Sequence, residues 1–162
     1  MITYVLTISE KFPKTHKRAG QETGFPLAIK HYEKIHTIRA NYALWKKRFE
    51  KINAGKAILV LKVWVGKPYG KGSTQHSIFK YDNTWGIGVE RLEFFENQFD
   101  IPCINYPLIN THEEPTIETI AKNDGLSLVD FKEWFKNYDL SQEMAIIHFT
   151  DFRYAKKLAT NH

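Results

Sequence analysis

Short runs of apolar and β-branched residues recur along the chain and indicate strands. Residues 2–8 alternate between two faces, with Ile, Tyr and Leu on one face and Thr and Val on the other. Residues 57–65 form the most apolar run and are rich in β-branched side chains, which is typical of a central strand. The same reasoning predicts further strands at residues 35–39, 78–81, 85–95 and 144–149.

Helical patterns separate these strands. Residues 42–53 place apolar side chains on one face and Lys and Arg on the other, as in an amphipathic helix. Pro26 suits the first turn of a short helix. Another helix is predicted to begin at Glu114 and to stop at Gly125, where glycine can take the left-handed position after the last turn. Ser127 is predicted to cap the helix that follows.

Three stretches lack either period and are predicted to be loops. Residues 11–20 and 66–77 combine Gly and Pro with basic residues, and residues 101–110 are interrupted by prolines. A chain of 162 residues has the size of one ordinary domain and can bury a core without a disulfide or a metal. We therefore expect one α+β domain at residues 1–150 and a polar tail at residues 151–162.

Composition excludes several classes of protein. Cys103 is the only cysteine, which fits a reducing cytoplasm, and we interpret it as a small buried residue. The seven histidines include no pair at the i, i+4 spacing of a helical metal site, so we expect neither a metal nor another cofactor. No apolar run approaches the length that crosses a bilayer, so no membrane partner is expected.

The positive charge is concentrated in the first part of the chain. Residues 1–72 contain 15 Lys or Arg and 4 Asp or Glu, whereas residues 73–162 contain 8 and 14. A basic half favours phosphate or nucleic acid if the fold gathers its charges on one face. Lysines spread over a solvated surface are the ordinary alternative.

The run from Glu33 to Arg39 carries the clearest candidate chemistry. Side chains alternate along a strand, so Thr37 and Arg39 share a face and His36 points to the other. Lys34 lies at the turn before the strand, where its ammonium could reach the Thr37 hydroxyl. A threonine becomes a nucleophile when an adjacent base removes its proton. The ordinary alternatives are an exposed lysine, a strand threonine and a salt-bridged arginine.

In these residues the chain resembles the ASCH family of the PUA-like superfamily, whose hallmark is a lysine-containing turn that runs into a Thr-Ile-Arg strand. The similarity extends from about Phe25 to Phe149. Besides Lys34 to Arg39, it includes Trp45, residues 57–65, residues 64–69 and residues 120–125. The resemblance implies a mixed or antiparallel β-barrel of about five to seven strands with flanking helices.

The resemblance also implies site residues. The small bacterial members that deacylate N4-acetylcytidine look like a lysine, a threonine three residues on and a distant glutamate acting together. Lys34 and Thr37 fall on the first two positions, and Asp124 stands where the glutamate is found. The glycine often found before the lysine is replaced here by Tyr32-Glu33.

We therefore expect an ASCH-like domain that binds RNA or a modified nucleobase or nucleoside in a basic cleft. Arg39 and Lys67 would hold the ligand, and Trp64 or Tyr69 would stack on a base. The alternative is an amidohydrolase, with Thr37 as nucleophile, Lys34 as its base and Asp124 as proton carrier or ligand anchor. A second alternative is a non-catalytic accessory protein, because fold does not determine function. Neither GxxxxGK[ST] nor GxGxxG occurs, so nucleotide hydrolysis is unsupported.

Overall fold

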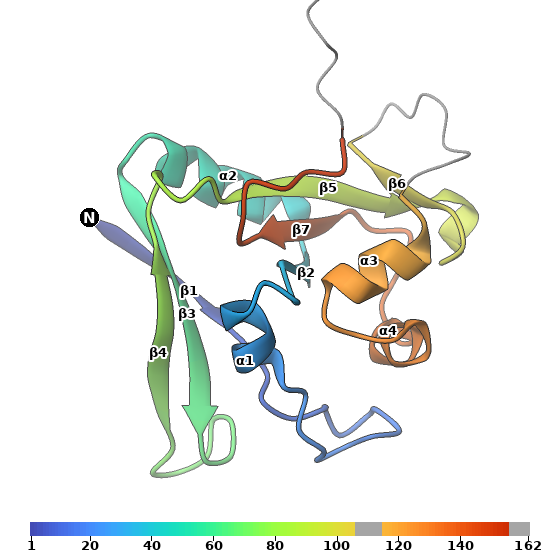
Figure 1. Cartoon of the computed structure of the whole chain (residues 1–162), viewed down its shortest axis with the longest axis horizontal. Helices are drawn as coiled ribbons and strands as arrows, with labels where there is room; N and C mark the ends of the chain where they lie inside the picture. The colour runs from blue at the N-terminus through green and yellow to red at the C-terminus, as the bar shows by residue number, and fades with distance from the viewer. Residues whose placement is uncertain (106–114, 156–162) are drawn as a thin grey trace, which may run out of the picture.

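Two β-sheets form the framework of the protein (Figure 1). The computed structural model describes residues 1–105 and 115–155. One sheet has three strands in the order β1-β3-β4, namely β1 (Ile2–Thr7), β3 (Ala57–Val65) and β4 (Thr74–Tyr81). The other has four strands in the order β2-β7-β5-β6, namely β2 (His36–Ala40), β7 (Met144–His148), β5 (Gly88–Phe94) and β6 (Pro102–Ile104).

The pairing pattern explains which strands are most apolar. β3 lies between β1, which is parallel to it, and β4, which is antiparallel. Leu59 and Leu61 of β3 are completely buried. β7 lies between β2 and β5, antiparallel to both, and all five of its residues are buried. The central strand of each sheet therefore supplies the core.

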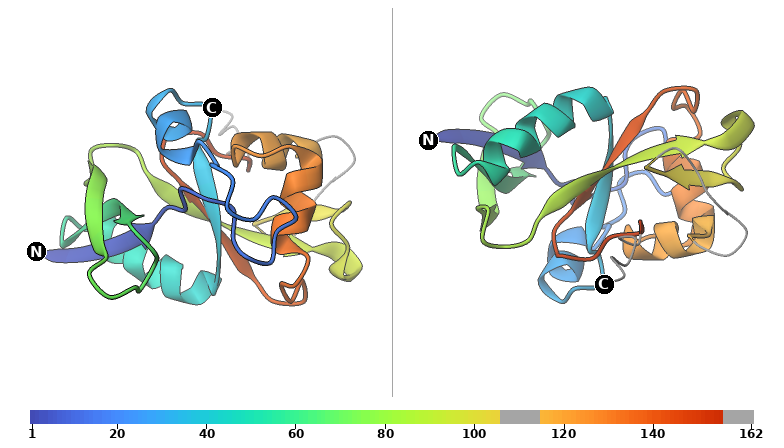
Figure 2. Two further views of the ribbon diagram at one scale, coloured as in Figure 1. Left: turned by 90° about the horizontal axis from the view of Figure 1, so that it is seen from below. Right: turned by 90° about the horizontal axis from the view of Figure 1, so that it is seen from above.

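Four α-helices and one 3-10 helix complete the described fold. The α-helices are α1 (Phe25–Lys30), α2 (Tyr42–Asn53), α3 (Ile117–Asn123) and α4 (Leu128–Phe135), and the 3-10 helix spans Phe95–Asn97. α2 contacts β3, β5 and β7 and so joins the two sheets. α3 and α4 pack on each other beside the four-stranded sheet, and the loop between β1 and α1 crosses in front of β2 toward α4 (Figure 2).

The structure confirms the α+β class. The strands belong to two separately hydrogen-bonded sheets, and the described residues form no closed barrel. The helix at 42–53 is confirmed at both ends. Ser127 caps α4 by accepting a hydrogen bond from the Asp130 amide, and Gly125 takes the left-handed conformation after α3, with φ +79°.

Several predicted boundaries are wrong for identifiable reasons. β4 begins at Thr74, so the predicted loop at 66–77 is four residues shorter at its end. Residues 74–77 are polar, and their pairing with the apolar strand β3 makes them part of β4. β6 lies within the stretch 101–110 that was predicted to be irregular. Proline is tolerated at its first residue because β6 is an edge strand, where the missing N–H of Pro102 removes no hydrogen bond between strands. The strand predicted at 85–95 begins at Gly88.

The third helix and the tail also differ from prediction. α3 begins at Ile117 with Thr116 as its cap, and Glu114 lies outside the described residues, as do residues 106–110 of the predicted irregular stretch. Residues 151–155 were predicted to start a polar tail, but they pack back on β5. The backbone N–H groups of Tyr154 and Ala155 donate to the buried carboxylate of Glu90 at 2.8 and 3.0 Å. Residues 156–162 lie outside the described part.

Within residues 1–105 and 115–155, the helices are all too short or too polar to pass through a bilayer.

Candidate functional site

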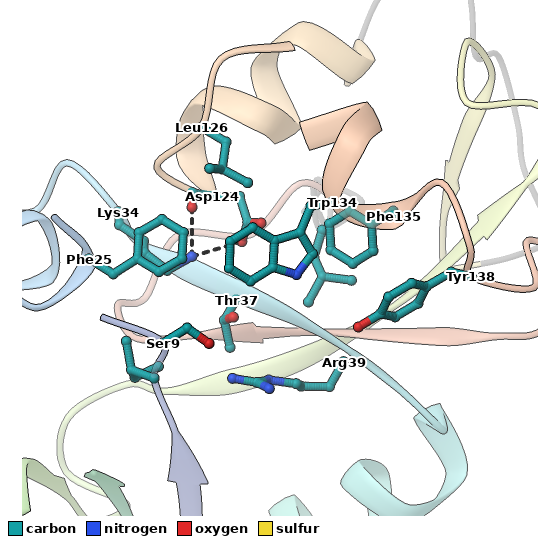
Figure 3. A pocket seen from close by; sticks show the side chains of 12 residues that line it. Ser9, Phe25, Lys34, Thr37, Arg39, Asp124, Leu126, Trp134, Phe135 and Tyr138 are labelled. Carbon is teal, nitrogen blue, oxygen red and sulfur yellow. Dashed lines mark hydrogen bonds and ion pairs between the residues drawn. The ribbon is translucent and has the colours of Figure 1, made fainter. Parts of the chain in front are cut away.

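A small pocket of about 30 Å³ lies between β2, the turn joining α3 to α4, and α4 itself (Figure 3). Aromatic rings from α1 and α4, those of Phe25 and Trp134, form part of its wall. The polar side chains that line it are Ser9, Lys34, Thr37, Arg39, Asp124 and Tyr138. All the lining residues together come from five separate stretches of the chain, at 8–9, 25, 34–39, 124–126 and 134–138, so only the tertiary fold assembles the pocket.

Lys34 is the most deeply buried charged group of the pocket, with 1% of its surface exposed. Its Nζ donates to the backbone carbonyl of Asp124 at 2.6 Å and to Asp124 Oδ1 at 3.2 Å. It also lies 4.1 Å from the centre of the Phe25 ring. Burial lowers the pKa of Lys34, and the Asp124 carboxylate opposes this only in part. A lysine in this environment is poised to lose its proton.

The end of α3 explains how Asp124 meets Lys34. The Leu126 N–H donates to the Ala121 carbonyl and the Gly125 N–H to the Lys122 carbonyl, the pattern of a Schellman motif. A Cβ atom on Gly125 would lie 3.1 Å from Lys34 Cβ. Glycine therefore serves both the left-handed turn and the close approach of Lys34.

Thr37 and Arg39 project from the same face of β2, as strand alternation predicts. Thr37 is 7% exposed, and Figure 3 shows its side chain between Lys34 and Arg39. Arg39 Nη2 donates to the Thr7 carbonyl, whereas Arg39 Nε is buried and has no hydrogen-bond partner among the described residues. Arg39 also lines the pocket, so its positive charge lies close to the space that a ligand would occupy.

His36 points to the opposite face of β2 but still contributes to the site. Strand alternation predicts that His36 points away from Thr37, and its Nδ1 contacts Asp124 Oδ1 at 3.2 Å from the far side of the strand. Its Nε2 lies 2.6 Å from the Tyr154 hydroxyl. The ring is completely buried, and burial lowers its pKa. His36 is therefore part of the wall behind Asp124.

A second buried group lies beside His36. His148 Nε2 is 2.8 Å from Glu90 Oε1, and the two imidazole rings meet edge to face at 5.5 Å. Burial lowers the pKa of His148 to about 4. Hydrogen bonds from His148 and from two backbone N–H groups hold the pKa of Glu90 below its usual range, although burial opposes them.

Four of the seven predicted site residues line one pocket, and three do not. Lys34, Thr37, Arg39 and Asp124 come together there. Trp64, Lys67 and Tyr69 instead lie on β3 and the loop after it, and none of them lines the pocket. There the Trp64 and Tyr69 rings are 4.9 Å apart, and Tyr69 is 88% exposed.

Sequence reasoning missed several lining residues. Phe25 and Trp134 were not among the predicted site residues, because a stripe of aromatic residues at helical spacing does not distinguish core from pocket wall. Tyr138 continues the helical spacing of Leu128, Phe131 and Phe135, which is typical of core, and Ser9 carries no local pattern. Their role depends on where their elements pack.

Among the described residues, His, Cys, Asp and Glu side chains form no group of three or more that could hold a metal ion. Comparisons of the chain with protein-family models, curated proteins and solved structures find no match.

Proposed function

We propose that the protein is an ASCH-like amidohydrolase whose pocket binds an acylated nucleobase or nucleoside, such as N4-acetylcytidine, and cleaves its amide. The observation that carries the proposal is that Lys34, Thr37 and Asp124 line one pocket although 90 residues separate the first from the last. The assignment to the PUA-like superfamily, with its barrel, is part of the proposal. A cytoplasmic location is also part of it, supported by the single, buried Cys103.

Thr37 supplies the nucleophile and Lys34 the base. A neutral Lys34 amine has two N–H groups for its two Asp124 acceptors and keeps a lone pair for the Thr37 proton. Thr37 Oγ attacks the amide carbon, the C–N bond breaks, and Lys34 returns the proton to the leaving amine. A water molecule deprotonated by Lys34 then attacks the acyl ester, the bond to Thr37 Oγ breaks, and Lys34 returns the proton to Thr37 Oγ. The products are the free nucleoside and a carboxylic acid.

Arg39 stabilises the charge that develops on the carbonyl oxygen. The Arg39 side chain lines the pocket, so its guanidinium charge lies close to an oxyanion formed there. Fixed donors in a site shielded from water can contribute about 3 kcal/mol to the transition state. Burial is the main cause that lowers the pKa of Lys34, and the nearby positive charge of Arg39 lowers it further.

The size of the pocket restricts the substrate. A volume of about 30 Å³ holds roughly two water molecules, which is enough for a small acyl group and too little for a nucleobase. The acyl group therefore enters, and the base stays at the opening. There it meets the rings of Trp134 and Tyr138, which line the pocket, and ring stacking on a base is favourable.

The test is the release of cytidine from N4-acetylcytidine by the purified full chain, followed by liquid chromatography. Thr37→Ala and Lys34→Ala are expected to lose turnover by about a thousandfold, because each removes a reacting group. Thr37→Ser should retain part of the activity, since it keeps the hydroxyl. The control is Lys67→Ala, an exposed lysine outside the pocket.

The proposal is overturned if the wild-type chain releases no cytidine from N4-acetylcytidine and no amine from other short acyl-cytosines. It is also overturned if Thr37→Ala turns over as fast as the wild type. In either case the accessory-protein alternative gains.

A second candidate function is RNA binding by the three-stranded sheet, outside the pocket. Residues 51–81 contain six Lys and no Asp or Glu, and they include β3 and β4. The exposed Tyr69 ring, with Trp64 beside it, offers a stacking surface in this acid-free region. A positive surface with aromatic rings suits single-stranded nucleic acid.

This second function is tested by fluorescence titration of a single-stranded RNA at several salt concentrations. Affinity should fall as salt rises, because phosphate contacts release counterions. Tyr69→Ala should weaken binding by about 1–3 kcal/mol, and Tyr32→Ala, which removes another exposed tyrosine ring, should leave it unchanged. The RNA function is excluded if no complex forms at low salt.

A further inference from the structure

Behind the pocket, buried hydrogen bonds connect Asp124 to the C-terminal part of the described chain. His36 Nδ1 lies 3.2 Å from Asp124 Oδ1, and His36 Nε2 lies 2.6 Å from the Tyr154 hydroxyl oxygen. The same Asp124 oxygen accepts a hydrogen bond from Lys34. The reaction proposed above uses Lys34 and Asp124 but neither His36 nor Tyr154.

The neutral state of His36 determines where its single proton lies. Burial lowers the pKa of His36 against the opposing effect of Asp124, so the ring is neutral near pH 7 and carries one proton. With that proton on Nε2, the Nδ1 lone pair would face the Asp124 carboxylate, and two acceptors at this distance repel each other. The contact with Asp124 therefore favours the form with the proton on Nδ1, in which His36 donates to Asp124.

Tyr154 completes the arrangement on the other side of the ring. The Asn123 amide nitrogen, which can only donate, lies 3.0 Å from the Tyr154 hydroxyl oxygen. The hydroxyl thus accepts from Asn123, and its 2.6 Å contact with the lone pair of His36 Nε2 is one in which the hydroxyl donates. A donor at Nε2 excludes a proton there and favours the Nδ1–H form of His36.

Tyr154 is held in place by contacts on several sides. Glu90 accepts hydrogen bonds from the backbone N–H of Tyr154 and Ala155 and from His148. Arg153 donates to the Gly86 carbonyl at 2.8 Å. The Tyr154 ring also packs 5.6 Å from the His36 ring and 5.8 Å from the His148 ring. These contacts hold the hydroxyl in the position that His36 requires.

We propose that Tyr154 and His36 are positioning residues for the pocket: Tyr154 keeps the His36 proton on Nδ1, and His36 thereby holds the Asp124 carboxylate against Lys34. The kinetic consequence rests on the proposed amidohydrolase function. The hydrogen-bond arrangement itself is measured without substrate. Within residues 1–105 and 115–155, the titratable groups that face His36 besides Tyr154 are Lys34, Asp124, Glu90 and His148.

The first measurement is ¹⁵N NMR of the histidine rings, in which the nitrogen shifts report the tautomer. His36 of the wild type should be protonated on Nδ1. Tyr154→Phe removes only the hydroxyl and should shift His36 to a mixture of the two forms. Tyr4→Phe, which removes a hydroxyl far from His36, should leave the Nδ1–H form unchanged.

The second measurement is NMR titration of the Lys34 side chain in protein labelled with ¹³C-lysine. Asp124 raises the pKa of Lys34 against the effect of burial. When His36 no longer holds the carboxylate, the Asp124 side chain can turn away, so the pKa of Lys34 should fall in Tyr154→Phe. Tyr4→Phe should titrate like the wild type.

The kinetic measurement uses N4-acetylcytidine. Tyr154→Phe should lower kcat by about tenfold, because misplaced groups leave attack geometry, and should change KM by less than about twofold, since no substrate contact is lost. His36→Asn, whose amide can donate to Asp124 in place of Nδ1, should keep most of kcat. In that background, adding Tyr154→Phe should have little further effect, because the interaction it removes is already gone.

The inference is overturned if wild-type His36 is protonated on Nε2, or if Tyr154→Phe leaves both the tautomer and the Lys34 titration unchanged. A wild type without turnover overturns the amidohydrolase proposal alone, because the two NMR measurements still decide the positioning role. The inference is also contradicted if adding Tyr154→Phe to the His36→Asn variant lowers kcat by a further tenfold.

Discussion

Charged residues are buried in the pocket but exposed at the hairpin tip, residues 66–73. In the pocket, Lys34 is 1% exposed and is bonded to Asp124, which lies 90 positions further on in the sequence. At the hairpin tip, Lys67 and Lys71 are exposed beside the exposed Tyr69 ring. Sequence reasoning combined both regions into one cleft, whereas the structure separates them. Burial therefore distinguishes the pocket, where the pKa of a lysine can shift, from the hairpin tip, where exposed lysines can only attract negatively charged ligands.

Removing one lysine from each region is the strongest test of this difference. Lys34→Ala leaves the buried Asp124 carboxylate without its cation and should cost about 3–5 kcal/mol of the free energy of unfolding, in addition to the loss of turnover. Lys67→Ala should change stability by less than about 0.5 kcal/mol. Urea denaturation of both variants measures the contrast. Equal losses in the two variants would show that Lys34 is not buried as described.

The pH dependence of stability should also arise on the buried side. The pKa of His148 is lowered to about 4 from a usual 6.5, so the unfolded chain binds the proton first as the pH falls. The free energy of unfolding should therefore fall by about 3 kcal/mol between pH 6.5 and 4 from this group alone, and its contribution should be constant below that range.

His148→Gln keeps a donor for Glu90 but does not titrate, so its stability should fall less between pH 6.5 and 4. Urea denaturation at several pH values measures the difference from the wild type. The matched control is His76→Gln, because His76 is an exposed residue of β4. If the two variants lose stability in parallel as the pH falls, the buried histidine is not the cause.

Substitution of two glycines allows the cost of a left-handed backbone to be measured apart from the cost of a close contact with Lys34. Gly125 and Gly72 both have φ +79°, but a Cβ atom on Gly125 meets Lys34 at 3.1 Å, whereas one on Gly72 meets nothing within 4 Å. Gly72→Ala should cost about 1 kcal/mol from the left-handed backbone alone. Gly125→Ala should cost about 1 kcal/mol more, since Lys34 must move.

The glycine variants are compared by thermal and urea denaturation, with turnover as a second readout. Gly125→Ala should also lower turnover, and Gly72→Ala should not. Identical losses of stability would mean that Gly125 serves only the turn.

The smallest effect is expected at the hairpin tip. Tyr69→Ala should leave the stability of the chain unchanged to within about 0.5 kcal/mol, because the ring is 88% exposed. Circular dichroism during thermal unfolding is sufficient to measure it. A larger loss would show that the Trp64–Tyr69 contact stabilises the hairpin.

The sequence by itself determined the elements whose signals are local. The helix at 42–53, the Ser127 cap and the glycine after α3 follow from periodicity and backbone preference over a few residues, and so does the shared face of Thr37 and Arg39. The boundaries of β4 and β6 depend on pairing partners elsewhere in the chain. Pairing can make a strand of a polar or proline-containing stretch, so local composition did not reveal them.

Only the tertiary structure decided which of these residues meet. Lys34 approaches Asp124 because α3 packs beside the turn before β2, and Trp64 and Tyr69 stay apart from them because β3 belongs to the other sheet. The link from His36 to Tyr154 depends on a segment that sequence reasoning assigned to a polar tail. Burial, which lowers the pKa of Lys34, is a property of everything packed around the side chain, and a linear pattern of residue types does not contain it.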